Sequence, residues 1–106
     1  MGKMFAAVTL GIAIPFLAMA STYEVNIKDH RFDPTTLTIP AGERVKLMVN
    51  NLDPTVEEFE GENFDVEKII PGKSKAAVFV GPLEPGEYEF IGEFHRDTAK
   101  GKLIVE

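Results

Sequence analysis

Apolar and polar residues alternate along much of the chain after residue 20, and this period of two is typical of half-buried β-strands. The clearest runs are residues 23–27, 45–49 and 88–94, and residues 37–39 form a shorter one. Residues 76–80 are more uniformly apolar, and Gly/Pro pairs separate the runs. No helical period is sustained. The pattern predicts an all-β sandwich or barrel of about seven to eight strands.

The segment 51–63 breaks this alternation and is predicted to be a polar, acidic loop. It carries four carboxylates within six residues, at Glu57, Glu58, Glu60 and Glu62. Like charges this close repel one another, so the segment favours a bound cation or a basic partner. The alternative is a solvated acidic loop.

The first 20 residues have the pattern of a secretory signal peptide. Lys3 precedes the apolar run 4–17, and Ala18-Met19-Ala20 supplies small residues before a cleavage point after Ala20. The alternative, a membrane anchor, is disfavoured because the run is shorter than the ~20 residues that span a bilayer. A lipid anchor is not expected, since lipoproteins require a cysteine at the cleavage site and the sequence has none. The predicted organisation is a signal peptide at 1–20 and one domain at 21–106.

The charge of the predicted domain restricts its partners. The chain has 17 acidic and 11 basic residues, and removal of Lys3 leaves 10 basic residues and a net charge of −7. This charge argues against nucleic acid or an anionic membrane as a partner, and favours cations or a basic surface. Met48 is the one methionine left of four, which argues against a methionine-rich copper carrier.

Two segments of the domain resemble the cupredoxins, the blue-copper family. FDPTTLTIPAGERVKLMVNN, at 32–51, is similar to the family's opening strand pair, and YEFIGEFHRDTAKGKLIVE, at 88–106, to its closing ligand loop. The resemblance covers nearly all of 21–106 and implies a Greek-key fold. It places His95 at a ligand histidine, Gly92 at the ligand cysteine and Thr98 or Ala99 near the ligand methionine.

The cysteine missing at Gly92 excludes the family's usual chemistry. Blue-copper colour and fast electron transfer depend on a short copper–thiolate bond. A chain without cysteine cannot form one, so a type 1 blue copper centre is not expected.

The resemblance also indicates what faces His95. Aligning the family's H-N-F motif on Glu57-Glu58-Phe59 puts Glu57 at the first ligand histidine, with Glu58 one residue away, and the choice between them stays open. In the family fold this loop converges with the loop that holds His95. Imidazole suits copper, iron and zinc, while carboxylate shifts the preference towards harder ions such as iron and manganese. Iron or copper is therefore the expected cofactor.

The remaining candidates each have two readings. Glu93 is a further metal ligand or a solvent-facing charge. Asp97 is a carboxylate near the metal or an Asx-turn residue, and Met48 approaches the site or covers a sheet face. His30 is an exposed turn histidine or part of a second site. No residue can be assigned a catalytic role, because neither Ser21 nor Ser74 lies near a histidine and no P-loop or dinucleotide motif is present.

A narrower resemblance is carried by VEEFEGE, IIPGKS, GPLEPGEYEF and GEFHRDTAKG. These motifs look like the small periplasmic cupredoxin-like proteins of bacterial iron-uptake systems that accompany an Ftr-type iron permease. The resemblance implies a periplasmic protein that handles or oxidises ferrous iron, with the permease and a second periplasmic metal protein as partners. The alternative is a non-catalytic docking module with a vestigial metal site.

Overall fold

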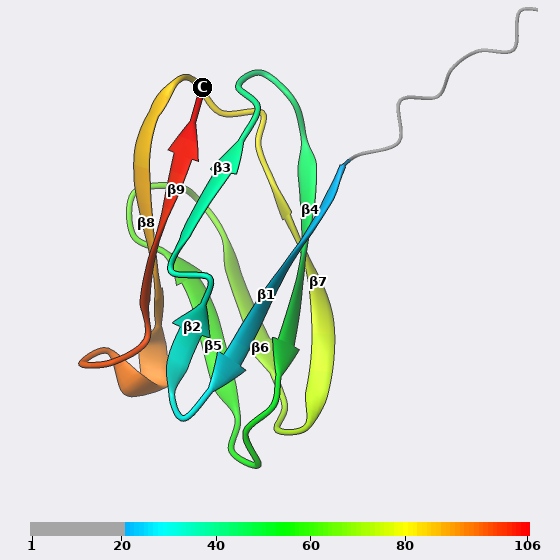
Figure 1. Ribbon diagram of the computed structural model, residues 1–106, viewed down its shortest axis with the longest axis vertical. Helices are drawn as coiled ribbons and strands as arrows, with labels where there is room; N and C mark the ends of the chain where they lie inside the picture. Colours follow the sequence, from blue (N-terminus) through cyan, green and yellow to red (C-terminus); the bar gives the residue numbers. More distant parts are fainter. Residues whose placement is uncertain (1–20) are drawn as a thin grey trace, which may run out of the picture.

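The computed structural model describes residues 21–106, so the predicted signal peptide at 1–20 lies outside the described residues. Within the described part, nine β-strands form two sheets that pack face to face (Figure 1), and a single 3₁₀ turn is the one helical element. This arrangement confirms the predicted all-β sandwich, with nine strands where about seven to eight were expected. In residues 21–106 no helix is long and apolar enough to cross a membrane.

The first sheet has the strand order β2-β1-β4-β7. β1 pairs with β4 in parallel, while β1–β2 and β4–β7 are antiparallel. The inward positions of β1 and β4 include the buried aliphatic residues that the alternation predicted, and β4 ends on the buried Asn51. The strands are β1 (Thr22–Lys28), β2 (Arg31–Asp33), β4 (Val45–Asn51) and β7 (Ser74–Val80).

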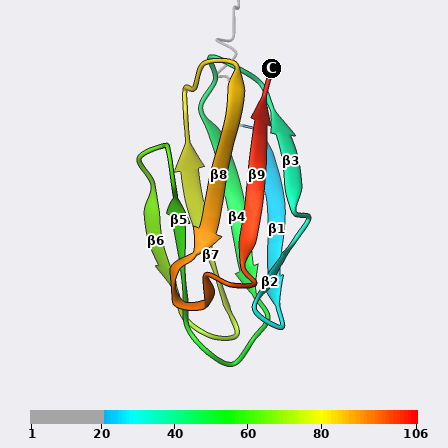
Figure 2. The same cartoon turned by 90° about the vertical axis from the view of Figure 1, so that its left-hand side faces the viewer.

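The second sheet has the order β3-β9-β8-β5-β6, and Figure 2 shows most of it facing the viewer. β3 pairs with β9 in parallel, and the other pairs are antiparallel. The chain crosses between the sheets after β2, as Greek-key connections do. The strands are β3 (Thr36–Ile39), β5 (Glu57–Gly61), β6 (Glu67–Ile70), β8 (Gly86–Gly92) and β9 (Lys100–Val105).

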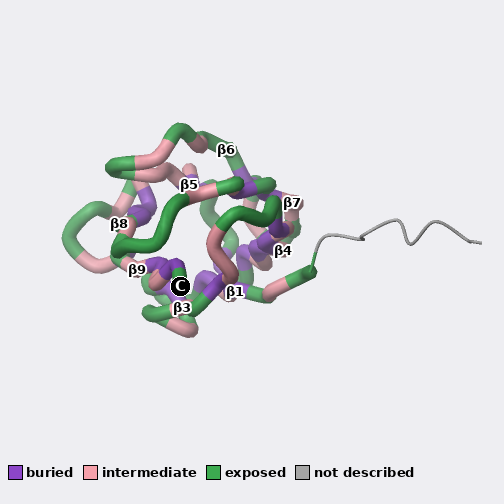
Figure 3. The backbone as a smooth tube through the Cα atoms, turned by 90° about the horizontal axis from the view of Figure 1, so that it is seen from above, coloured by how far each residue is buried: buried purple, intermediate pink, exposed green. Residues whose placement is uncertain are grey.

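The core lies between the two sheets, and Figure 3 shows buried stretches on strands of both. Its centre is aromatic: Phe59 of β5 stacks on Phe90 of β8 with ring centroids 4.9 Å apart, and Phe32 of β2 meets Phe90 edge-on, also at 4.9 Å. Such pairs contribute about 0.5–1.5 kcal/mol beyond the area that they bury. Phe59 is paired with Gly92 across β5 and β8, so this packing fixes the strand end on which the site is built.

Two local predictions were wrong. The predicted acidic loop contains strand β5, whose inward residues are Glu57 and Phe59. A carboxylate at an inward position breaks the apolar alternation by which a strand is recognised. Phe94 was expected to extend the inner face of β8, but that strand ends at Gly92, and Phe94 lies in the 3₁₀ turn η1 (Glu93–His95), 50% exposed.

Several connections gather at one end of the sandwich, at the bottom of Figure 1. They are the β1–β2 hairpin turn, the β4–β5 loop, the β6–β7 turn and η1 with the loop that follows it. The hairpin and the β4–β5 loop extend from the first sheet, and η1 extends from the second. The predicted site residues His95 and Glu57 both lie here.

Candidate metal centre

Glu57 is a buried carboxylate at the start of β5, with 1% of its surface exposed. Its Oε1 accepts hydrogen bonds from the backbone N–H groups of Glu58 and Phe94, both at 2.9 Å. Its Oε2 lies 2.6 Å from Nδ1 of His95. A buried carboxylate needs such partners, because burying a charge without them is very costly. Both oxygens of Glu57 are thus engaged, one by backbone and one by imidazole.

His95 closes the turn η1 and is fixed on two sides. Its carbonyl oxygen accepts hydrogen bonds from the backbone N–H of Thr98 at 3.2 Å and of Ala99 at 2.8 Å. Its side chain is 25% exposed and is held by Glu57 through Nδ1. The carboxylate oxygen requires a proton on Nδ1, so a neutral His95 keeps its lone pair on Nε2. A histidine whose second nitrogen is held by a carboxylate is the usual arrangement of a metal ligand.

Gly92 makes room for Glu57. A β-carbon at position 92 would lie 2.7 Å from Cδ and Oε2 of Glu57 and 2.6 Å from the β-carbon of Ala99. Real β-carbons do not approach other atoms so closely. Glu57 and Ala99 therefore fill the space that a side chain at position 92 would need. The thiolate position is closed sterically as well as by the lack of cysteine.

His30 joins the site, although the sequence left it as a turn histidine or part of a second site. It lies in the two-residue turn between β1 and β2, where Asp29 has φ 53° and His30 has φ 59°. Two consecutive positive φ values are typical of the type I′ turn that matches the twist of a hairpin. The His30 ring stacks on that of His95, with centroids 3.6 Å apart and planes within 10° of parallel.

Asp53, which the sequence did not indicate, holds this turn. It is 7% exposed, and its two carboxylate oxygens accept the backbone N–H groups of Asp29 at 2.8 Å and His30 at 2.9 Å. Burial alone raises the pKa of Asp53, but these two hydrogen bonds, with the nearby His30 and His95 imidazoles, outweigh burial and hold it below its usual range. On the other side, Thr98 Oγ1 donates to the His30 carbonyl oxygen at 2.6 Å.

A shallow hollow of about 500 Å³ lies beside the two imidazoles. Asp97 is exposed on its edge, so its side chain lies near the site but not against Glu57. The hollow is the solvent-accessible approach to His95. It is lined by His30, Glu93, Phe94, His95, Arg96, Asp97 and Thr98.

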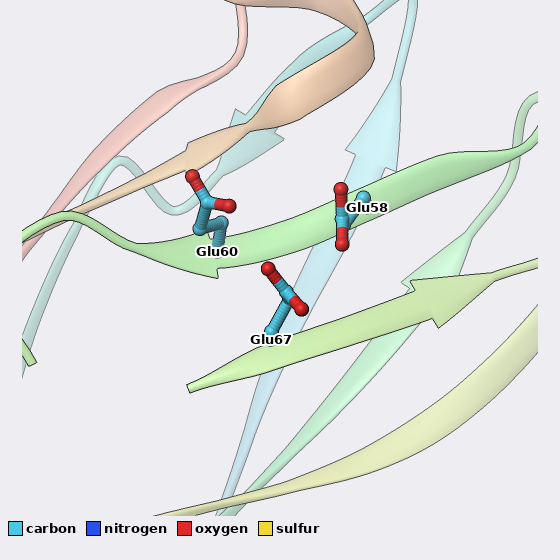
Figure 4. Close-up of side chains that lie close together, drawn as sticks. All are labelled: Glu58, Glu60 and Glu67. Carbon is cyan, nitrogen blue, oxygen red and sulfur yellow. The ribbon is translucent and has the colours of Figure 1, made fainter. Parts of the chain in front are cut away.

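The other predicted ligands are Glu58 and Glu93. Among the described residues, neither side chain is hydrogen-bonded to Glu57 or His95, although Glu93 lines the hollow beside His95. Glu58 faces outward from β5 with Glu60, and Glu67 of β6 joins them, with carboxylate oxygens within 4.8 Å of one another (Figure 4). Glu93 is paired with Arg96 at 3.0 Å. Partial burial first, and then neighbouring carboxylates, raise the pKa of Glu58 and of Glu60. This outer acidic cluster is therefore a repulsive surface.

Met48 also lies away from the centre. It is on the outer face of β4, where its paired neighbours are Glu24 and Ala77, while Leu47 and Val49 face the core. The structure therefore brings together Glu57 and His95 of the predicted set, and adds His30 with Asp53 behind it.

Comparison with known proteins agrees with this fold. Residues 4–105 match the family described as the cupredoxin-like domain, so the chain belongs to the cupredoxin-like domain family. A relative from Rickettsia prowazekii, the uncharacterised protein RP394, is 40% identical over 82 residues, which are 77% of this chain and 66% of the relative.

Solved structures of the same fold are more distant in sequence. Auracyanin A, a "blue" copper protein from Chloroflexus aurantiacus, superposes with a TM-score of 0.74 at 19% identity, covering 83% of this chain and all of that one. Auracyanin B superposes at 0.71 and 18% identity, covering 82% of this chain and 89% of that one. At such identities the likeness shows the fold alone.

The residues present do not fit a blue-copper centre. The position that the family resemblance assigns to the ligand cysteine is Gly92, and the adjoining space is filled by Glu57 and Ala99. The donor set is instead imidazole nitrogen with a carboxylate behind it. Such a set suits a metal ion bound by nitrogen, water and oxygen ligands.

Proposed function

We propose that this chain binds a divalent transition-metal ion at His95, with the ion as its cargo or substrate. The observation that carries the proposal is the 2.6 Å contact between the buried Glu57 carboxylate and Nδ1 of His95. This contact leaves Nε2 as the ligand atom and gives it a fixed direction. The carboxylate also makes the imidazole a stronger electron donor to the ion.

Charge supports a cation as the ligand. Glu57 places a carboxylate beside His95, and the chain carries an excess of acidic residues. A net negative surface raises the local concentration of cations and speeds their arrival. The remaining coordination positions are open to water, as in a carrier or a site of turnover, whereas a structural site fills its positions with protein ligands.

In its narrower form, the proposal is that the ion is ferrous iron, handled or oxidised in the periplasm for an iron permease. Support comes from the resemblance of the sequence to proteins of iron-uptake systems and from the carboxylate in the site, which favours harder ions. In an oxidation, each ferrous ion gives up one electron, either to dioxygen or to a bound copper(II) ion that becomes copper(I). A second periplasmic metal protein is a further partner in this proposal.

Metal titration of untagged protein tests binding. The wild type is titrated with ferrous iron under anaerobic conditions and with copper(II), and is compared with His95→Asn. We expect the variant to lose most of the affinity for either ion. Equal affinities for wild type and variant would overturn the proposal. Ferric iron formed under air, with and without copper, then tests the oxidase form, and a rate equal to that of buffer would exclude it.

A second candidate function is a docking module with a vestigial metal site. It is favoured by three exposed apolar side chains in the connections at the site end, Leu52, Val56 and Phe94. In that case the His95→Asn and Glu57→Ala proteins bind iron and copper as weakly as the wild type does. The same titration therefore separates the two functions.

A further inference from the structure

The two histidines of the chain lie against each other. The sequence contains only His30 and His95, and they come from opposite sheets: His30 from the β1–β2 turn and His95 from the connection between β8 and β9. Their rings are 3.6 Å apart and nearly parallel. Paired imidazoles are a common metal-binding arrangement, since imidazole is the usual nitrogen ligand of copper and zinc.

The backbone at His30 has an uncommon conformation. A φ of 59° is uncommon for a residue other than glycine, although histidine adopts it more readily than most. Glycine or asparagine would fit the type I′ turn with less strain. Three hydrogen bonds nevertheless hold the turn in place. The N–H groups of Asp29 and His30 donate to Asp53, and Thr98 donates to the His30 carbonyl oxygen. Strained residues held in this way are concentrated at functional sites.

We propose that His30 is the second protein ligand of the metal ion, which binds through one ring nitrogen each of His30 and His95. The inference rests on the proposed function, since His95 is common to both. Glu57 then acts as a positioning residue, because both of its oxygens are already engaged by backbone N–H groups and by His95. The carboxylate orients His95 without contacting the ion.

Coordination requires the His30 ring to leave the stack. The lone pairs of imidazole lie in the ring plane, so two parallel rings do not aim at one point. The His30 side chain is only half-buried. Within residues 21–106 its one polar contact is a 3.4 Å approach of Nε2 to Thr55 Oγ1. A bond of that length is weak. Rotation of the His30 side chain about its own torsions therefore breaks only this weak contact and the stacking on His95.

This ligand set changes the expected ion. A carboxylate with one imidazole favours harder ions, whereas two imidazoles favour copper(II), which also has the highest affinity among divalent first-row metals. We therefore expect copper(II) to bind more tightly than manganese(II) or ferrous iron. The copper is a non-blue centre completed by water.

Copper(II) titration and electron spin-echo spectroscopy of untagged protein test the inference. The spectra count coordinated imidazoles, and we expect two in the wild type and one in His30→Asn or His95→Asn. The affinity should fall at least about tenfold in each variant, as it does even when an outer partner of a ligand is lost. Asparagine tolerates positive φ, so the turn is retained. Asp29→Asn, in the same turn, is the matched control and should bind copper as the wild type does.

The outcomes separate the two levels of the proposal. If His95→Asn abolishes binding while His30→Asn keeps wild-type affinity, and the wild type shows one imidazole, the His30 inference is overturned and the proposed function stands. If neither variant alters binding, both are overturned. A second variant, His30→Gly, suits the turn better, so it should melt close to the wild-type temperature and still lose copper affinity. A melting temperature well below wild type with unchanged affinity would show a structural role instead.

Discussion

The two faces of β5 place identical side chains in opposite environments. Glu57 points inward, where two backbone N–H groups and His95 surround its carboxylate. Glu58 and Glu60 point outward, where their neighbours Glu67 and Glu93 are also carboxylates. Both environments remove water from a carboxylate. Around Glu57, hydrogen-bond donors take the place of water. Around Glu58 and Glu60, other carboxylates do.

The difference shows that carboxylate content alone does not locate a cation site. The acidic run was the sequence signal for a cation site, yet the carboxylate that contacts an imidazole is Glu57, the one that faces away from the others. Glu57 holds the imidazole of His95 in position. The outer carboxylates, in contrast, lack a nitrogen ligand among the described residues of their cluster.

The largest effect is expected from removing the inner carboxylate. Glu57→Ala leaves the N–H groups of Glu58 and Phe94 and Nδ1 of His95 without an acceptor, and each buried unsatisfied donor costs about 1–3 kcal/mol. We expect the free energy of unfolding to fall by about 3 kcal/mol or more, measured by urea denaturation. Glu58→Ala on the outer face is the control and should not be destabilised. Equal losses in both variants would remove the distinction between the faces.

The next largest effect concerns the space that Glu57 occupies. Gly92→Ala places a β-carbon against Glu57 and Ala99, and overpacking of this kind costs about 1–3 kcal/mol. In the double variant Glu57→Ala/Gly92→Ala the methyl group enters the vacated space. Its destabilisation should be less than the sum of the single losses by at least about 0.5 kcal/mol. Additive losses would mean that the two positions do not compete.

A third carboxylate, Asp53, tests whether backbone donors explain the favourable environment. Asp53→Asn should lower the free energy of unfolding by about 1–2 kcal/mol at neutral pH. The asparagine amide has one acceptor oxygen, and its NH2 group is a donor, so it cannot accept the two N–H groups on two separate oxygens as the carboxylate does. The pKa of Asp53 is lowered in the fold. Its contribution is therefore present above the unfolded pKa of about 3.9, and is lost as pH falls through the lower folded value. The difference between wild type and variant should shrink below about pH 4, and a constant difference would contradict this account.

The smallest effect has the opposite sign. Glu60→Gln removes one charge from the outer cluster, where burial and neighbouring carboxylates raise the pKa of Glu60. A raised folded pKa means that ionisation destabilises the fold above that pKa, and that the penalty disappears below the unfolded pKa of about 4.3. The variant should melt slightly above wild type at pH 7. The gain should vanish on acidification and shrink in high salt, which screens the neighbouring carboxylates but does not restore the lost hydration. A lower melting temperature at pH 7 would show that the cluster is not repulsive.

Much of the fold was predictable because most strands bury one face. Val25 and Ile27 in β1, and Val45, Leu47 and Val49 in β4, are buried as the alternation requires. β5 was missed because its pattern contains Glu57 on the inner side. A strand whose inward residue belongs to a site does not follow the hydrophobic pattern that reveals ordinary strands.

The candidate site was predictable in part. The motif around His95 and the alignment of Glu57 indicated two residues that the structure places in contact. The part played by His30 depends on a contact between the two sheets, and no local pattern encodes it. One signal was present: Asp-His stands in a two-residue turn between alternating strands, where Asp-Gly would be the usual choice. The closed space at Gly92 also required three-dimensional packing, since Ala99 and Glu57 are distant in sequence.

The parallel pairing of β3 with β9 affects the order in which the chain folds and the proposed metal site forms. Thr36 pairs with Lys102, so the second sheet is complete only when nearly the whole chain is available. Contacts between residues so distant in sequence form slowly, because a long loop must close first. His30 and Thr98 meet across the same span. Before folding is complete, His30 and His95 thus lie on separate, unassembled segments, so the two-imidazole site proposed above would form only after folding.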